Sequence, residues 1–129
     1  MAIAGVLALC IGASKQLTIT TLPKSVTVQS GDSVHLECDT TDAYEGVFQW
    51  LVYRLDHERP FDQIFSTQGD IHMPTDEYPM SKYTPSGMYG LNITGVDWRD
   101  GAEYACQFVI GSVMAQASVV VIGMGALLY

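Results

Sequence analysis

The chain has 129 residues, and six lysines and arginines against fourteen aspartates and glutamates give it a net charge of −8. A charge of this sign repels polyphosphates and anionic lipid surfaces, so we expect no nucleic-acid binding. Because 48% of the residues are hydrophobic and 16% are charged, the chain is expected to fold as one domain rather than remain disordered. No apolar run is long enough for a complete transmembrane helix.

The amino-terminal segment is apolar. Residues 2–13 form an unbroken run of apolar and small residues with the length of a signal-peptide core, although no basic residue follows Met1. We interpret residues 1–13 as a signal peptide, with a retained amino-terminal strand extension as the alternative. Residues 14–129 then form a single domain.

The chain contains three cysteines, Cys10, Cys38 and Cys106. Cleavage of the leader removes Cys10 and leaves one pair, as an oxidising compartment favours. We therefore expect the protein to be secreted or displayed on the extracellular face of the plasma membrane. No Cys-x-x-Cys motif or Cys/His cluster is present, so neither a metal nor another cofactor is expected.

Beyond residue 16 the hydrophobic pattern has a period of two, which is typical of strands with one face on a core. Apolar and polar positions alternate in the segments 34–38, 48–53, 91–93 and 104–108. Turn-forming residues separate these segments. Short strands at this spacing predict an antiparallel β-sandwich or barrel.

The cysteines favour the sandwich. Cys38 and Cys106 lie at inward-facing positions of strands that are far apart in the sequence, so a disulfide between them would join distant strands. Trp50 lies on the strand after Cys38, where its ring can pack against the sulfurs and fill the middle of the core.

Two further segments carry a family resemblance. The run Leu91-Asn92-Ile93-Thr94-Gly95-Val96 precedes the run Asp100-Gly101-Ala102-Glu103-Tyr104-Ala105-Cys106. With Cys38 and Trp50, these residues resemble variable-type (V-set) domains of the immunoglobulin superfamily, and the resemblance covers about residues 17–122.

The resemblance implies an all-β Greek-key sandwich of two antiparallel sheets with an intersheet Cys38–Cys106 disulfide. It also implies a core signature of Trp50, Leu91 and Tyr104, in which the Tyr104 hydroxyl bonds to nearby backbone. Lys82 is expected to form a salt bridge with Asp100, partly exposed and worth about 1 kcal/mol or less alone.

The carboxyl end permits two interpretations. The segment Ile122-Gly123-Met124-Gly125 looks like the aromatic-Gly-x-Gly bulge of joining segments, with isoleucine in place of the aromatic residue. Residues 122–129 would then be a joining-segment-like tail, similar to the non-rearranging V-J-type molecules of invertebrate chordates. Alternatively, the last strand ends near Ile122 and a linker or the start of a membrane anchor follows.

Binding, rather than catalysis, is the predicted function. The three histidines lie on separate segments, and no nucleophile elbow or metalloprotease helix motif is present. The resemblance offers two binding surfaces. One is the loop end, formed by residues 39–46, 68–74 and 109–113. The other is the outer face of the sheet of strands G, F, C and C′.

The outer face is expected to pair two domains, because its outward positions carry more apolar residues than a solvated face needs. These positions are Leu51, Tyr53, Ala105, Gln107 and Val109, with Ile64 or Phe65 joining from strand C′. We expect a homodimer or a pair with a related V-type domain, acting in immune-type recognition or cell adhesion.

Asn92 begins an Asn-Ile-Thr glycosylation sequon and should face solvent on the sheet opposite the pairing face. The alternative function is that of a soluble carbohydrate-binding defence protein. Sugar sites commonly use exposed aromatic platforms, and the candidate side chains are Tyr44, Tyr78, Tyr83 and Trp98. The sequence does not identify the protein or carbohydrate ligand.

Overall fold

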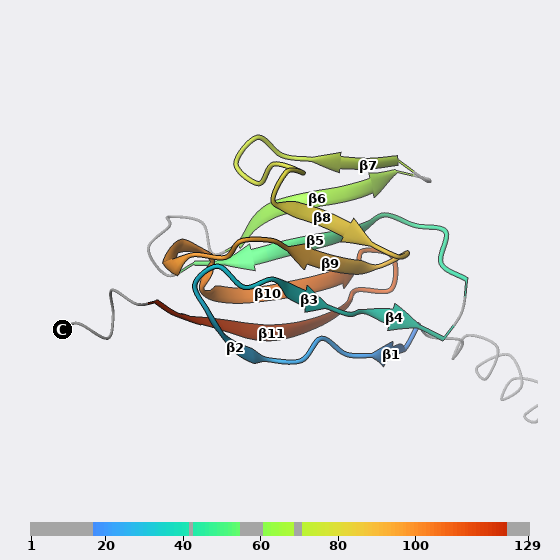
Figure 1. Ribbon diagram of the computed structural model, residues 1–129. Coiled ribbons are helices and arrows are strands. Elements are labelled where there is room, and N and C mark those ends of the chain that lie inside the picture. The colour runs from blue at the N-terminus through green and yellow to red at the C-terminus, as the bar shows by residue number, and fades with distance from the viewer. Residues whose placement is uncertain (1–16, 42, 55–60, 69–70, 124–129) are drawn as a thin grey trace, which may run out of the picture.

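The structure is a computed structural model in which residues 17–41, 43–54, 61–68 and 71–123 are described (Figure 1). The predicted signal peptide, residues 1–13, lies outside the described residues. In chain order the elements are β1 (Ile19–Thr21), β2 (Val26–Gln29), β3 (Val34–Leu36), β4 (Asp39–Thr40), β5 (Phe48–Tyr53), β6 (Phe61–Gln68), β7 (Ile71–Pro74), β8 (Tyr83–Ser86), β9 (Gly90–Ile93), the 3₁₀ turn η1 (Trp98–Asp100), β10 (Ala102–Phe108) and β11 (Val113–Ile122).

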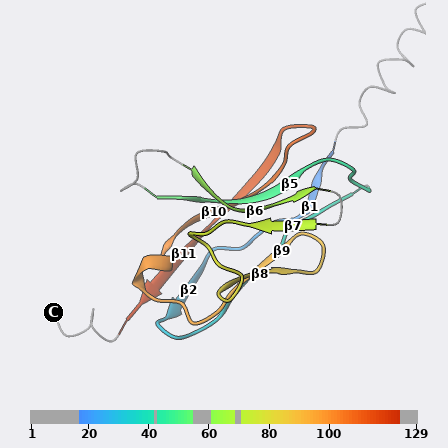
Figure 2. The ribbon, with the colours of Figure 1, turned by 90° about the horizontal axis from the view of Figure 1, so that it is seen from above.

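The strands form two main sheets. The larger sheet has the order β2-β11-β10-β5-β6-β7, the smaller has the order β3-β9-β8, and β1 pairs with β4. Strand β2 runs parallel to β11, whereas the other pairs are antiparallel. Seen from above, β5, β6 and β10 lie in one layer and β8 and β9 in the other (Figure 2). This arrangement confirms the predicted all-β sandwich.

The core lies between the two layers and follows the period of two in the sequence. On β5 the burial of Phe48, Trp50 and Val52 alternates with half-buried neighbours. The indole of Trp50 is fully buried, and its Nε1 donates a hydrogen bond of 2.9 Å to the backbone oxygen of Tyr89. Because that nitrogen has a partner, the ring is buried without an orphaned donor.

A disulfide between Cys38 and Cys106 joins the two layers, as expected. Cys106 lies on β10 of the larger sheet, and Cys38 follows β3 of the smaller sheet. Both cysteines are buried, and 68 positions separate them in the chain. The crosslink therefore restricts a large part of the unfolded chain.

Strand β6 corrects one expectation about the outer face. Neither Ile64 nor Phe65 reaches that face, because both side chains are buried. The register shifts here: Trp50 pairs with Phe65, whereas Leu51 pairs with Gln63. Such a bulge lets two successive residues of one strand oppose the core. Gln63, rather than an apolar residue, consequently occupies the outward position on β6.

The carboxyl-terminal strand β11 pairs with β10 over Val113–Val119 and with β2 over Val119–Ile122, where it ends. Strands β10 and β11 meet in a short turn in which Gly111 has a φ of 99° and Ser112 a φ of 54°. Gly123 follows the strand, and Gly125 lies outside the described residues.

Removing the disulfide should destabilise the fold strongly. We expect Cys38→Ala/Cys106→Ala to lower the free energy of unfolding by about 4 kcal/mol, since the unfolded chain regains the loop entropy that the crosslink removes. Denaturant titration monitored by tryptophan fluorescence measures this loss. Reduction of the unaltered protein should give a similar loss, and unchanged stability in both experiments would contradict the role assigned to the crosslink.

Candidate functional site

A buried carboxylate organises the end of the sandwich near η1. Asp100 is 2% exposed, and its Oδ2 lies 2.8 Å from Nζ of Lys82. The hydroxyl of Tyr83 donates to Oδ1 of the same carboxylate. The hydroxyl of Tyr104 donates a 2.6 Å hydrogen bond to the backbone oxygen of Asp100. These contacts hold β8 and β10 against η1.

Burial and ion pairing shift the pKa values of several groups around this cluster. Burial raises the pKa of Tyr83 and of Tyr104, so both hydroxyls remain protonated donors. The side-chain hydrogen bond from Arg99 lowers the pKa of Asp97 to about 2, and the charge of Lys82 acts in the same direction. Tyr83 and Tyr104 therefore act as hydrogen-bond donors that fasten the strands to η1, which is consistent with a structural role.

The outer face of the larger sheet is built from two rows of outward-facing residues. The glutamine row contains Met114, Gln107, Gln49, Ser66 and Met73, which are cross-strand neighbours from β11 to β7. The leucine row contains Gln116, Ala105, Leu51 and Gln63. None of the side chains in these two rows carries a charge.

Three glutamines on this face form a hydrogen-bonded ladder. Nε2 of Gln63 donates to Oε1 of Gln49 over 2.7 Å. Nε2 of Gln49 then donates to Oε1 of Gln107 over 2.6 Å. The ladder crosses from β6 through β5 to β10 and fixes side chains that would otherwise be free to rotate. The face is therefore polar but preorganised.

Two residues predicted for this face do not present a side chain on it: Ala105 has an outward position but is enclosed, and Val109 lies elsewhere. Ala105 is fully buried, because its methyl group is shorter than its cross-strand neighbours Leu51 and Gln116. Val109 is 42% exposed but lies in the turn after β10, where its N–H donates to the backbone oxygen of Val47. Val109 therefore belongs to the loop end.

The other three predicted face residues do lie on the larger sheet's outer side. Leu51, Tyr53 and Gln107 are half-buried there. Tyr53 packs against Phe61 of β6 with ring centroids 5.2 Å apart. Glu103, the cross-strand partner of Tyr53, is the first carboxylate beyond the leucine row. The uncharged area thus ends at this third row and, beside Leu51 and Gln63, at a hollow that Asp62, Asp76 and Glu77 also line.

At the loop end, one tyrosine connects the β4–β5 loop to the β10–β11 turn. The hydroxyl of Tyr44 donates to the backbone oxygen of Val47 over 2.6 Å and accepts from the N–H of Ile110 over 2.8 Å. Its ring packs edge-on against Phe108. A Cβ at Gly46 would lie 2.6 Å from the Tyr44 hydroxyl, so this close approach requires glycine.

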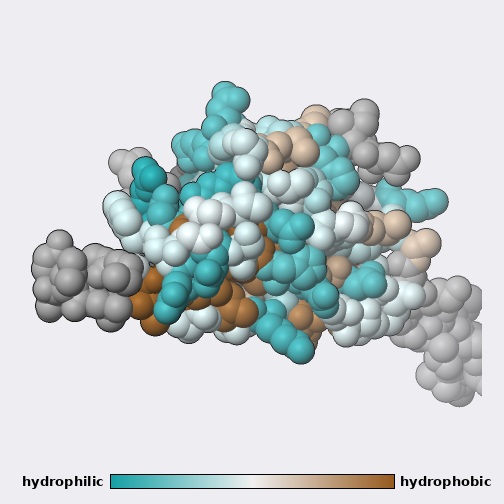
Figure 3. All heavy atoms as spheres, viewed as in Figure 1, coloured by the Kyte–Doolittle hydropathy of each residue, from teal (hydrophilic) through white to brown (hydrophobic). Residues whose placement is uncertain are grey.

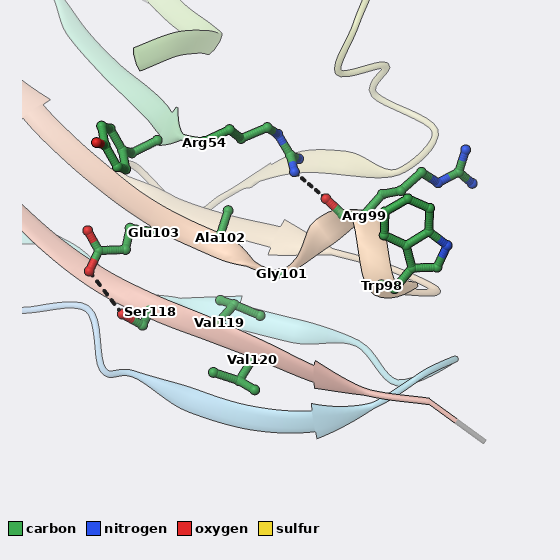
Figure 4. Close-up of a pocket in the computed structure, with 10 residues that line it drawn as sticks. Arg54, Trp98, Arg99, Gly101, Ala102, Glu103, Ser118, Val119 and Val120 are labelled. Atoms are coloured by element: carbon green, nitrogen blue, oxygen red, sulfur yellow. Dashed lines mark hydrogen bonds between the residues drawn. The ribbon is translucent and has the colours of Figure 1, made fainter. Parts of the chain in front are cut away.

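A groove of about 940 Å³ lies at the opposite end, between the end of β5, η1, β10 and β11 (Figure 4). Its apolar wall includes Trp98, which is 78% exposed, and Val120. Arg54 donates to the backbone oxygen of Arg99, and Arg99 in turn pairs with Asp97 over 2.9 Å. Ion pairing therefore offsets part of the positive charge at the groove.

The predicted sugar-binding aromatics do not form a common platform. Tyr44 lies at the loop end, whereas Trp98 lies on η1 beside the groove. Tyr78 and Tyr83 are buried and contact one another with ring centroids 5.1 Å apart. Within the described ranges, no three His, Cys, Asp or Glu side chains gather to hold a metal ion.

The sequon residue Asn92 lies on β9, the middle strand of the smaller sheet. It is half-buried, and its Oδ1 lies 2.5 Å from Nδ1 of His35 on β3. Hydrophilic and intermediate residues cover most of this side of the molecule, and hydrophobic ones gather in the lower part of the view (Figure 3). Asn92 is thus on the sheet opposite the outer face, as expected.

The model of the immunoglobulin V-set domain family matches residues 21–121. The chain belongs to the immunoglobulin V-set family. Strands β11, β10, β5 and β6 are accordingly the strands G, F, C and C′ of the V-set domain. V-set domains generally act in recognition or adhesion and are typically extracellular. In the part of the chain that the structure describes, no helix is long and apolar enough to cross a bilayer.

Solved structures agree on the fold. A chain from the structure of T cell specificity and activation by the bacterial superantigen toxic shock syndrome toxin-1 matches with 18% identity and a TM-score of 0.65, covering 82% of this chain and 98% of that one. Murine CRIg matches with 18% identity, a TM-score of 0.64 and the same coverage. A marsupial T cell receptor matches with 15% identity and a TM-score of 0.64, covering 82% of this chain and 51% of that one.

These likenesses identify the architecture and no ligand, since 1911 chains of solved structures match this V-set domain. A search of curated protein sequences finds no significant match.

Sequence reasoning missed the glutamine ladder and the Tyr44 bridge. Gln49 precedes Trp50 and Gln107 follows Cys106, so alternation alone places both glutamines outward. Their contact depends on the pairing of β5 with β10, and the third member depends on the bulge in β6. No sequence signal fixes either register.

Loss of the Tyr44 hydroxyl should loosen the loop end. We expect Tyr44→Phe to speed amide hydrogen exchange at Ile110 and to lower the free energy of unfolding by about 1 kcal/mol, because one bridging group makes two hydrogen bonds. NMR-detected exchange measures the first effect. Tyr53→Phe, which keeps its ring against Phe61, is the matched control, and equal protection of Ile110 in both variants would contradict the bridge.

Proposed function

We propose that this V-set domain is a non-enzymatic, extracellular recognition or adhesion module that pairs with a second copy of itself through its outer face. The observation that carries the proposal is the absence of charge from the glutamine and leucine rows in a chain of net charge −8. Charged residues are depleted at the cores of protein interfaces. An extracellular location, secreted or on the cell surface, is supported by the disulfide.

Electrostatics favour this face over the remaining surface for self-association. Two copies of an acidic chain repel each other, so contact is least costly where both surfaces lack carboxylates. The half-buried Leu51 lies in the uncharged leucine row, at its border with a hollow that Asp62, Asp76 and Glu77 also line, and can contact its counterpart across a two-fold axis. Its apolar side chain would gain burial on pairing.

A charge at Leu51 should abolish the pair. We expect the unaltered protein to dimerise with at least about 1,000 Å² buried in total. We expect Leu51→Asp to weaken dimerisation by at least about 100-fold, because two carboxylates would meet in a desolvated contact. Sedimentation equilibrium measures the dissociation constant.

Met80→Asp is the matched control, because Met80 is 46% exposed in the turn before β8 and not on the outer face. The dissociation constant of the Met80→Asp dimer should equal that of the unaltered protein. A mass of 14.1 kDa for the unaltered, unprocessed chain at all concentrations, or an unchanged dimer for Leu51→Asp, would refute the proposal.

We also propose that Asn92 carries an N-linked glycan. The hydrogen bond to His35 engages the side-chain oxygen of Asn92 and leaves Nδ2, the atom that a glycan modifies, for attachment. Because Asn92 lies on the smaller sheet, the glycan would not obstruct pairing through the larger sheet.

Secretion from eukaryotic cells should therefore yield a heavier protein, and peptide N-glycosidase treatment should remove the added mass. Thr94→Ala should abolish the added mass, since it destroys the sequon. Thr84→Ala, on the neighbouring strand β8, should retain it. A protein with the bare polypeptide mass before treatment would overturn this assignment.

A further inference from the structure

One wall of the groove beside η1 is an exposed indole ring. Trp98 is 78% exposed, whereas every other aromatic residue in the described ranges is buried or half-buried. The turn η1 is held by other side chains, because the Asp97 carboxylate accepts from the N–H of Arg99 and the Asp100 carboxylate accepts from the N–H of Asp97. The indole takes part in neither contact. A large aromatic ring exposed in this way commonly marks a binding site.

The groove is large enough to hold a small molecule. Gly101 and Ala102 line it at the start of β10, where their small side chains leave space, and Val120 of β11 is 50% exposed beside them (Figure 4). Its volume of about 940 Å³ lies within the range of ligand pockets, about 300–1,000 Å³. With Trp98 and Val120 on its walls, the groove suits a molecule with an apolar body.

The groove also carries a cation. Arg54 is half-buried at the end of β5, and its side chain extends toward η1 (Figure 4). Its Nε donates to the Tyr78 hydroxyl over 3.2 Å, and its Nη1 donates to the backbone oxygen of Arg99. Both acceptors are uncharged, and among the described residues no carboxylate lies within ion-pairing distance of this guanidinium. An anion bound beside Arg54 would offset the cost of its partial burial.

The other two charged side chains that line the groove have partners. Arg99 pairs with Asp97 over 2.9 Å. The Glu103 carboxylate points toward Ser118 and accepts a 3.2 Å hydrogen bond from its hydroxyl (Figure 4). Arg54 is therefore the side chain of the groove best placed to bind an acidic group.

We propose that this groove binds an aromatic organic acid, with the ring of the acid against the Trp98 indole and its carboxylate on the Arg54 guanidinium. Offset stacking on the indole suits a flat aromatic body. The N–H groups of Arg54 that do not face Tyr78 or Arg99 can donate two parallel hydrogen bonds to a carboxylate.

The site is distinct from the proposed pairing face. Neither Trp98 nor Arg54 belongs to the glutamine row or the leucine row, and the third row, Tyr53 and Glu103, separates the groove from Leu51. Binding of the acid therefore does not depend on self-association. Because the whole chain carries a charge of −8, long-range attraction does not favour an anion, and the affinity must come from the local contacts.

Nuclear magnetic resonance with a matched pair of ligands tests the site. 2-Naphthoate carries one carboxylate on a flat ring, and 2-naphthylmethanol has the same ring without the charge. The chain has two tryptophans, and the indole N–H of Trp50 is buried against the backbone oxygen of Tyr89, so only the Trp98 signal should respond. Trp98→Phe identifies that signal. We expect 2-naphthoate to shift it saturably, with a dissociation constant at least about tenfold lower than that of the alcohol.

Substitutions at Arg54 test the charge. In Arg54→Gln the preference for the acid should disappear while the alcohol binds as before, and Arg54→Lys should retain the preference because it keeps the charge. Isothermal titration calorimetry measures both ligands. If Arg54→Gln also loses the alcohol, the groove has collapsed and Arg54→Lys decides. A preference for the acid below about threefold in that variant would then overturn the proposal.

A substitution at Trp98 tests the stacking. Trp98→Ala should weaken the acid and the alcohol alike, by about tenfold, because both use the ring. Ile110→Ala is the matched control, since Ile110 is 67% exposed at the opposite end of the sandwich, and it should bind both ligands like the unaltered protein. Equal binding by Trp98→Ala and Ile110→Ala would place the ligand elsewhere and overturn the proposal.

Three further results would contradict the assigned ligand. The Trp98 signal could fail to shift with 2-naphthoate even at millimolar concentration, or the acid and the alcohol could bind equally to the unaltered protein. A Trp98 signal that moves on dilution without any ligand would identify a second copy of the chain as the occupant of the groove.

Discussion

The structure depends on one buried contact between its two layers: the Cys38–Cys106 disulfide and the indole of Trp50 beside it in the core. Trp50 and Cys106 are cross-strand neighbours on β5 and β10, and Cys38 belongs to the smaller sheet's side of the core. With these three side chains fixed inward, the period of two dictates that their immediate neighbours face outward. The composition of the outer face is therefore a consequence of the core.

The strands and the sandwich could be predicted from the sequence because each strand with one buried face has an apolar residue at every second position. Phe48, Trp50 and Val52 alternate in the sequence as they do in the structure. Alternation carries no information about where a strand slips by one position, so the bulge that buries both Ile64 and Phe65 was not predictable. It also does not report how far a side chain projects, and Ala105 is enclosed although it occupies an outward position.

For the candidate site, the sequence predicted which face of which sheet carries it, but not the contacts between its side chains. Leu51 and Gln107 were placed correctly by counting from the core residues beside them. The hydrogen bonds among Gln63, Gln49 and Gln107 depend on strand register, which long-range pairing sets. Val109 was assigned to the face because β10 was extended by one residue too many. Errors of this size change the chemistry attributed to a surface without changing the fold.

The Tyr44 hydroxyl has a consequence for how this domain can diversify. A single phenol oxygen contacts the backbone of both the β4–β5 loop and the β10–β11 turn, and glycine at position 46 makes room for it. An insertion in either segment would displace one of the two backbone groups and break the bridge. The two loops therefore cannot vary independently in length, and new binding specificities on this scaffold are more accessible through side-chain replacement than through insertion or deletion.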